Sequence, residues 1–265
     1  TGYATLGARL VTFDLTDPRR PVPMGYSRPM PGMATSITVV VLHAYVDLWS
    51  GEHGVAVVAI GDPYRPVLRS IIFGRTNAVA AGSDRLVVVG IDELKVYDVA
   101  DPGRPVQLGR LALGPLYYDV VVTPDGQRAF AASSDSMNPV VEIDLSDPRA
   151  PFLASSFALA GSRSVSSLYL AGDRLFATSI DRLHVLDIAA PGGLRELGST
   201  PLVDGDNKRH PKAVAVDGNR AVVVGDAGDW DHRIGQLWTL DVADPSAPRV
   251  LARIDLPAKL ANVSL

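Results

Sequence analysis

The stretch Leu94-Lys-Val-Tyr-Asp-Val-Ala-Asp-Pro-Gly-Arg-Pro-Val106 decides the fold of this chain. Its first half alternates, so that Leu94 and Val96 share one face, which is typical of a half-buried strand. Pro102 has no N–H group to donate and therefore ends this strand. Pro105 favours an extended conformation at Arg104, which starts the next strand. The stretch predicts a strand, a tight turn and a second strand.

This unit recurs along the whole chain, which predicts a repeat protein. The Asp-Pro turns begin at positions 17, 62, 101, 147 and 244, and Ala190-Pro191 stands in the equivalent place. A period in the forties with several strands per period indicates propeller blades. Apolar strands and Gly-containing hairpin turns such as Ala171-Gly-Asp173 bring each repeat to four strands. We therefore expect residues 1–265 to form a single all-β domain, a six-bladed β-propeller with four antiparallel strands per blade.

The alternating strand also predicts which side chains are structural. Aspartates at its fifth position precede the turn by a constant spacing, so each should accept a hydrogen bond from a turn amide. These are Asp14, Asp98, Asp144, Asp187 and Asp241. The apolar side chains expected in the core between blades are Leu94, Val96, Val140, Leu183, Val185 and Leu237.

The two ends of the chain predict how the ring closes. Thr1–Thr5 align with the second strand of a repeat, whereas Leu260–Leu265 resemble a first strand. The last residues should therefore complete the first blade and remove open sheet edges. The chain begins at Thr1 without a methionine or a signal-peptide pattern, which favours a processed protein or a domain of a longer one.

Composition excludes several classes of function. A formal charge of −4 without a basic stripe argues against a nucleic-acid partner. The absence of cysteine excludes disulfides, thiolate metal sites and cysteine catalysis. No apolar run is long enough for direct membrane insertion.

The repeat resembles the LVIVD-repeat family, whose pattern reads roughly (L/V)xVxD(V/I)xDPxxPxxxG. The match is most specific at 94–109 and 183–198, and it extends over essentially the whole chain. Ala59, Ala190 and Leu194 depart from the pattern only at turns. The resemblance implies a β-propeller of a bacterial or archaeal protein that is extracellular, at the cell surface or periplasmic. It leaves the function open.

Polar side chains at the start of each innermost strand are the main candidate site, because they should ring one mouth of the central channel. Rigid strands that present polar and aromatic groups at a channel mouth are suited to ligand binding. Polar groups also occur there simply because a channel holds water. The set is Asn262, Ser36, Asn77, Asp119, Ser164 and Lys212, with the neighbours Tyr117, Tyr118, Arg163 and His210.

An acidic insertion in the sixth repeat is a candidate metal site. Asp226, Asp229 and Asp231 place three carboxylates within six residues, and hard oxygen ligands at that density suit Ca²⁺. The spacing matches no EF-hand loop, and a solvated acidic hairpin is the commoner arrangement. We therefore expect no cofactor, with Ca²⁺ as the alternative. His210 and His232 match no zinc-binding spacing.

Two functions remain open. The regular repeats and the lack of a catalytic motif favour a non-catalytic scaffold that binds another protein, a ligand or another part of a longer parent chain. The alternative is a metal-dependent hydrolase or lactonase-like enzyme at the channel mouth, where Asn262, Asn77 and Asp119 would face a cation. The charge of Lys212 opposes a cation there.

Overall fold

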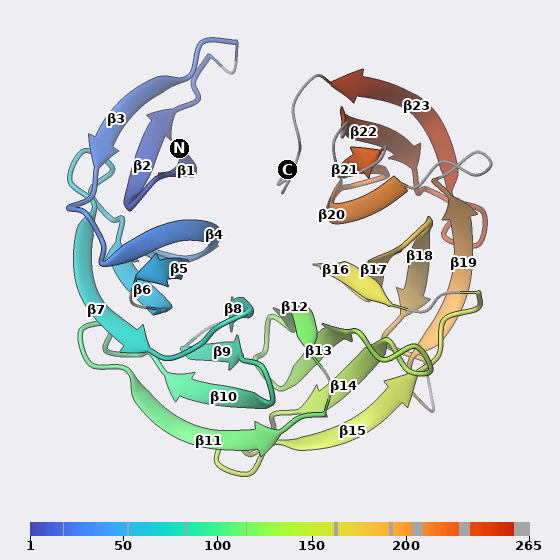
Figure 1. Cartoon of the computed structure of the whole chain (residues 1–265), viewed down its shortest axis with the longest axis horizontal. Coiled ribbons are helices and arrows are strands. Elements are labelled where there is room, and N and C mark those ends of the chain that lie inside the picture. The colour runs from blue at the N-terminus through green and yellow to red at the C-terminus, as the bar shows by residue number, and fades with distance from the viewer. Residues whose placement is uncertain are drawn as a thin grey trace. The chain divides into compact units, whose positions relative to one another are not determined.

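The computed structural model describes residues 1–17, 19–51, 53–82, 84–114, 116–161, 164–190, 193–202, 209–227 and 234–256. Every regular element within these ranges is a β-strand, and the strands form six sheets (Figure 1). These sheets are the blades of an all-β, six-bladed β-propeller, which confirms the predicted fold class. No helix capable of crossing a membrane occurs among the described residues.

The chain divides into two compact units. The first contains residues 1–114, 122–127 and 145–151, and the second contains the described parts of 115–121, 128–144 and 152–265. The boundary passes through the fourth blade, whose first and third turns belong to the first unit and whose strands belong almost wholly to the second.

The first unit holds three sheets with consecutive strand order. Blade one has three described strands, β1 (Gly2–Leu6), β2 (Arg9–Asp14) and β3 (Val22–Tyr26). Blade two comprises β4 (Gly32–Val40), β5 (His43–Gly51), β6 (Gly54–Ala59) and β7 (Val67–Phe73). Blade three comprises β8 (Ala78–Gly82), β9 (Arg85–Val89), β10 (Glu93–Asp98) and β11 (Val106–Ala112).

The second unit holds three four-stranded sheets of the same order. Blade four comprises β12 (Tyr117–Val122), β13 (Arg128–Ser133), β14 (Val140–Asp144) and β15 (Phe152–Phe157). Blade five comprises β16 (Val165–Ala171), β17 (Arg174–Ser179), β18 (Arg182–Asp187) and β19 (Arg195–Pro201). Blade six comprises β20 (Arg209–Asp217), β21 (Arg220–Ala227), β22 (Ile234–Asp241) and β23 (Arg249–Leu256).

The strand expected to complete blade one lies outside the described residues. Strands β1 to β3 correspond to the second, third and fourth strands of the other blades, as the sequence predicts. The pairing of 260–265 with β1 stays a prediction.

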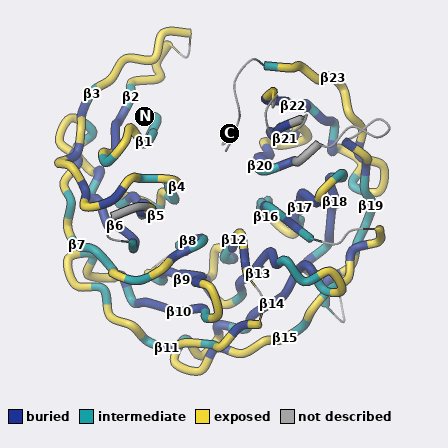
Figure 2. Tube along the Cα trace, in the orientation of Figure 1, coloured by how far each residue is buried: buried dark blue, intermediate teal, exposed yellow. Residues whose placement is uncertain are grey.

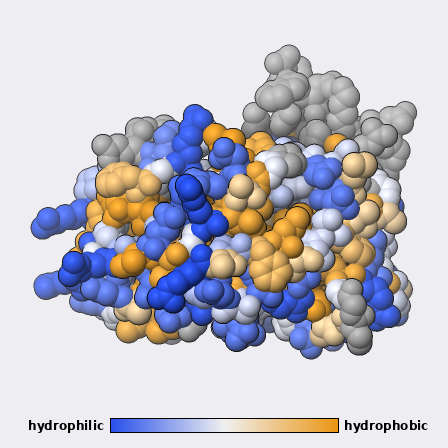
Figure 3. Space-filling model, turned by 90° about the horizontal axis from the view of Figure 1, so that it is seen from below, coloured by the Kyte–Doolittle hydropathy of each residue, from blue (hydrophilic) through white to orange (hydrophobic). Residues whose placement is uncertain are grey.

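Burial is concentrated in the two middle strands of each blade, whereas the last strand is largely exposed (Figure 2). Four apolar clusters each lie between neighbouring blades of one unit. In one of them Val57 of blade two packs with Leu86 and Val88 of blade three. Outside the core, apolar side chains are interspersed with long polar ones on the face shown in Figure 3.

The predicted core side chains are fully buried with one exception. Leu94, Val96, Val140, Leu183 and Val185 have no exposed surface, which confirms their assignment. Leu237 is only half-buried, so its assignment to the core was wrong. Trp238 on the opposite face of β22 fills the cluster between blades five and six instead, and strand alternation then turns Leu237 away from that cluster.

The repeated aspartates close the turns, as predicted. Oδ1 of Asp98 accepts a hydrogen bond from the amide of Ala100 at 2.9 Å, and Asp14, Asp187 and Asp241 accept equivalent bonds at 2.8–3.1 Å. The Asp-Pro aspartates accept a second set, such as Gly103 N to Asp101 Oδ1 at 3.0 Å. For Asp144 the structural role stays a prediction.

The glycine that ends the repeat motif packs against the Asp-Pro turn of the next blade. A Cβ added to Gly109 would lie within 3.0 Å of backbone atoms of Pro148 and Arg149. Gly25 meets the turn at Pro63 in the same way, and Gly198 meets the turn at Ser246. A register shift in the edge strand directly precedes this glycine, and the same shift recurs between the last two strands of every blade. In blades one, three and five a glycine is therefore required by the close contact with the next blade.

An arginine at the start of the second strand makes a further contact between blades. Nη1 of Arg85 donates to the carbonyl oxygens of Gly126 at 3.1 Å and Leu145 at 2.8 Å. Nη1 of Arg128 donates to the carbonyl oxygen of Ile188 at 2.9 Å. Leu145 and Ile188 each directly follow the repeat aspartate of the next blade, so the arginine caps the end of that strand.

We expect Gly109→Ala to destabilise the fold by about 1–3 kcal/mol, because the new methyl group must displace the backbone of the neighbouring turn. Gly114→Ala is the matched control, since nothing lies within 4 Å of a Cβ at that position. Thermal melting monitored by circular dichroism measures both. Equal melting temperatures for the two variants would show that the turn contact is loose.

We expect Asp98→Ala to lower the free energy of unfolding by on the order of 1 kcal/mol, because the Ala100 amide loses its acceptor. Asp98→Asn keeps an acceptor oxygen and should lose less. Urea denaturation of the three proteins tests this expectation, and an alanine variant as stable as the wild type contradicts it.

Candidate functional site on the first strands of the blades

The first strands of three blades bulge near their beginning, and the bulged residue is polar. The register of the first strand shifts around Thr35 in β4, around Ser166 in β16 and around Lys212 in β20. The sequence alignment placed Ser36 and Ser164 at these positions. In the structure Thr35 and Ser166 are the bulged residues. The sequence pattern misses this because a bulge inserts one extra residue into an otherwise alternating strand.

Asp119 on β12 is the most unusual carboxyl group in this set. Its Oδ2 accepts a hydrogen bond from Leu168 N on β16 at 2.8 Å, and its Oδ1 accepts one from Val120 N at 2.8 Å. The Ser167 hydroxyl also bonds to it. Burial nevertheless raises the pKa of Asp119 to about 6, although the three hydrogen bonds lower it. The carboxyl group therefore titrates near neutral pH.

Two tyrosines precede this carboxyl group on β12. The side chain of Tyr117 is buried, and burial raises the pKa of its phenol. Tyr118 is 44% exposed and points to the other side of the strand. Of these two tyrosines, Tyr118 is therefore the one that presents its side chain to solvent, on the face of the strand opposite to Asp119.

Lys212 on β20 forms an ion pair with Asp226 on β21. Nζ of Lys212 lies 2.5 Å from Oδ2 of Asp226, whose side chain is fully buried. The positive charge that the sequence placed at this position is therefore compensated within blade six. The backbone of His210 pairs with that of Asp226 across the two strands, and the His210 side chain lies outside the described part.

The predicted metal ligands are only partly described. Asp226 is committed to Lys212, whereas Asp229 and Asp231 lie outside the described residues. Among the described residues, no group of three His, Asp or Glu side chains is arranged to hold a metal ion. The calcium hypothesis stays a prediction.

The first unit contains a comparable polar group around Asp47 on β5. Its carboxyl group accepts hydrogen bonds from the hydroxyls of Thr35 at 2.9 Å and of Thr76, which precedes β8 in the next blade. Burial raises the pKa of Asp47 against these bonds. Nearby, Nδ2 of Asn77 donates to the carbonyl oxygen of Gly90 at 3.1 Å. Both side chains therefore connect structural elements of the first unit.

The remaining predicted residues, Arg163 and Asn262, lie outside the described part of the chain. Sequence reasoning missed Asp47 and Ser167. A lone carboxylate in the apolar run Tyr45-Val-Asp-Leu48 was the available signal for Asp47, because a charge is rarely buried without a partner.

A buried histidine in blade five lies between a serine hydroxyl and a carboxylate, as the histidine of a catalytic triad does. Nε2 of His184 lies 3.1 Å from Oγ of Ser179, and Nδ1 lies 2.7 Å from Oε1 of Glu196. Ser179 and His184 have no exposed surface, so a substrate has no access to the hydroxyl group. Burial lowers the pKa of His184, although Glu196 acts in the opposite direction. This arrangement holds the core of blade five and is not an active site.

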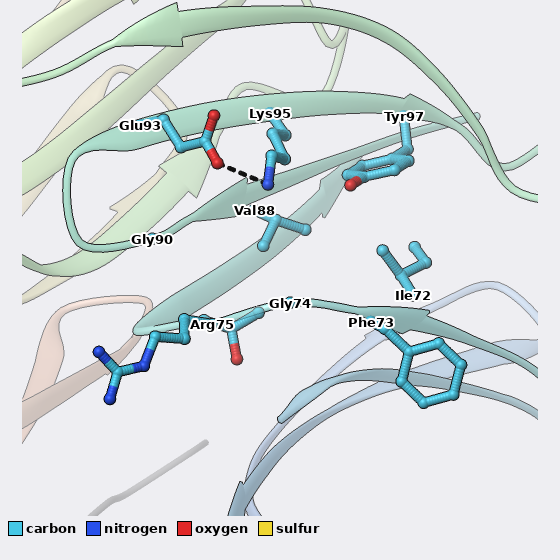
Figure 4. A pocket seen from close by; sticks show the side chains of 10 residues that line it. Ile72, Phe73, Gly74, Arg75, Val88, Gly90, Glu93, Lys95 and Tyr97 are labelled. Atoms are coloured by element: carbon cyan, nitrogen blue, oxygen red, sulfur yellow. Dashed lines mark ion pairs between the residues drawn. The ribbon is translucent and has the colours of Figure 1, made fainter. Parts of the chain in front are cut away.

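A small hollow lies between blades two and three. Its walls include Ile72 and Phe73 at the end of β7, and Lys95 and Tyr97 point into it from β10 (Figure 4). Nζ of Lys95 is bound to Oε1 of Glu93 at 2.6 Å. Two of the three charged side chains that line the hollow, Lys95 and Glu93, are therefore paired with each other, and Arg75 is the third.

No family model and no curated protein matches this chain. Its solved structural neighbours are similar in fold alone. Pseudomonas aeruginosa periplasmic gluconolactonase, PpgL, aligns with a TM-score of 0.72 and 16% identity over 97% of this chain and 80% of that one. A putative 6-phosphogluconolactonase from Bacteroides fragilis NCTC 9343 aligns with a TM-score of 0.69 and 13% identity over 96% and 79% of the two chains. A chain of a mitotic checkpoint complex aligns with a TM-score of 0.69 and 12% identity over 99% and 77%.

Proposed function

We propose that this propeller hydrolyses small cyclic esters of sugar acids, with Asp119 as the general base. The observation that carries the proposal is a half-buried carboxyl group whose pKa is raised to about 6 at the start of a rigid strand. A base with a pKa near the working pH combines sufficient ionisation with sufficient proton affinity. The likeness in fold to two proteins described as lactonases supports the same reaction class.

The hydrogen bonds of Asp119 leave room for a water molecule. A carboxylate has roughly four lone-pair positions, and Val120 N, Leu168 N and the Ser167 hydroxyl occupy three of them. A water bound at the remaining position would lose a proton to Asp119 as its oxygen bonds to the lactone carbonyl carbon. The ring C–O bond then breaks, and the proton passes to the alkoxide that leaves. The products are an open hydroxy acid and the regenerated carboxylate.

One feature of the second unit favours this reaction. The charge of Lys212 is neutralised by Asp226, so Lys212 is not an isolated cation on the first strands. The proposed step requires no metal ion.

The expectation of a non-catalytic scaffold stays a prediction, together with its surface or periplasmic location. The likeness in fold to a chain of a multiprotein complex supports it. The two functions differ in one measurable respect, since a scaffold has no pH-dependent turnover.

Lactone hydrolysis tests the proposal. With glucono-δ-lactone as the probe and spontaneous hydrolysis subtracted, we expect activity to rise with pH through about 6, because Asp119 must be ionised. Asp119→Asn should reduce kcat at least about a hundredfold, which is the usual contribution of a general base. Asp147→Asn, in an exposed turn, is the matched control. Absence of turnover in the wild type, or equal kcat in both variants, would refute the proposal.

Asp119 also gives a stability prediction that holds whatever the function. Its pKa in the folded protein lies above its ordinary value of 3.8, so the folded state binds the proton more tightly than the unfolded state. Its contribution is therefore fully present below about pH 4 and is lost as the pH rises through about 6. Relative to the wild type, Asp119→Asn should become progressively more stable over this range. Parallel melting curves at pH 4, 5, 6 and 7 measure the change, and a constant difference would contradict the raised pKa.

A further inference from the structure

The hairpin turn between β4 and β5 differs in sequence from the two-residue turns at the same place in blades five and six. Its two central residues are Val41 and Leu42, whereas blade five has Gly172-Asp173 and blade six has Gly218-Asn219. Gly172 and Gly218 have φ values of 56° and 52°, and Val41 has nearly the same value, 52°. Val41 is the one described residue other than glycine with a positive φ.

A valine at this position is unfavourable in two ways. Its branched Cβ is strained in the left-handed region, which glycine adopts freely. Its side chain is also 83% exposed, so no packing in the fold offsets that strain. Backbone outliers of this kind concentrate at functional positions. The turn therefore points to an interaction made outside the described fold.

Two further apolar side chains lie at the same end of blade two. Leu42 is 56% exposed, and its carbonyl oxygen accepts a hydrogen bond from Ile60 N. A Cβ added to Gly61 would lie 3.8 Å from Cδ2 of Leu42, so the leucine side chain lies over this glycine. Gly61 leads into the Asp-Pro turn, whose Tyr64 is 67% exposed. In an antiparallel blade the first and third turns lie at one end of the sheet. Val41, Leu42 and Tyr64 together form the apolar corner of blade two.

The charges beside the apolar corner are mainly positive. Arg65 follows Tyr64 directly and is exposed, as is Arg69 on β7. Arg69 is close enough to His43 to lower its pKa, in addition to the larger effect of burial, and His43 directly follows Leu42. Asp62 is exposed, and its carboxylate accepts the Tyr64 amide. The local balance is positive, in contrast to the net charge of −4 of the whole chain.

We propose that the apolar corner docks this protein on an anionic lipid surface. Exposed aliphatic side chains at a two-residue turn form a projecting tip, which lipid can surround without a complementary groove. A tyrosine suits the boundary between headgroups and acyl chains, and arginines are attracted to anionic headgroups. The contact is peripheral, because only turn residues reach the lipid. This inference is independent of lactone hydrolysis.

Vesicle co-sedimentation of the full chain tests the proposal. The probes are vesicles of phosphatidylcholine alone and vesicles with about 30% phosphatidylglycerol, the latter supplying a negative surface potential. The decisive variant is Val41→Gly/Leu42→Asp, which copies the Gly172-Asp173 turn. It should fold with equal or higher stability, because glycine relieves the strain. Val106→Ser, an exposed apolar side chain on β11, is the matched control.

We expect binding to the anionic vesicles only, with weaker binding at higher salt. The double variant should bind at least about tenfold more weakly, and Val106→Ser should bind like the wild type. No binding by the wild type, or equal binding by the double variant, would overturn the proposal. Self-association of the wild type that the double variant abolishes, without vesicle binding, would also overturn it and assign the corner to a second copy of the chain.

Discussion

One contact recurs between neighbouring blades: in blades one, three and five a glycine of the edge strand lies directly on the Asp-Pro turn of the next blade. This contact allows the two backbones to approach without a side chain between them. The contact depends on local structure, because hydrogen bonds to aspartates fix the backbone of the turn on which the glycine packs. Blade two has Ser70 in place of the glycine, and its Oγ donates to the carbonyl oxygen of Pro102 at 2.6 Å. A hydrogen bond there replaces close packing.

The first strands of neighbouring blades also contact each other, and these contacts are polar. Thr38 donates to the carbonyl oxygen of Val79 at 3.0 Å, and Ser166 donates to that of Pro211 at 2.7 Å. Asp119 connects β12 with β16 in the same way. These groups satisfy backbone atoms near the bulges, so their first role is structural. Asp119 differs because it is charged and partly desolvated, and the cost of its ionisation is what adapts it to proton transfer.

Local rules explain why the blade count and the turns could be predicted from sequence. Asp98, Pro102 and Pro105 act within a few residues of one another, so their effect does not require knowledge of distant partners. The contacts of Arg85 could not be predicted in the same way, because its acceptor at Leu145 is 60 residues away. The shift from Ser36 to Thr35 has a different cause, since a bulge leaves no signature in alternating hydrophobicity. The bulged polar residues thus lie on the strands where the sequence places the candidate residues, but the bulges move two of the positions, and the site itself stays a prediction.

Blade two shows how departures from the repeat should be interpreted. Ala59 replaces the turn aspartate, which removes one hydrogen bond to the turn. Ser70 replaces the glycine, and its hydroxyl forms a new hydrogen bond with the next blade. Val41 has no compensating contact, because its backbone is in the left-handed region and its side chain is exposed to solvent. The rest of the repeat uses residues that suit their local conformation. A strained residue that nothing in the fold compensates therefore indicates selection for a function other than stability. The turn at Val41 is therefore better explained by what it contacts than by what it contributes to the blade.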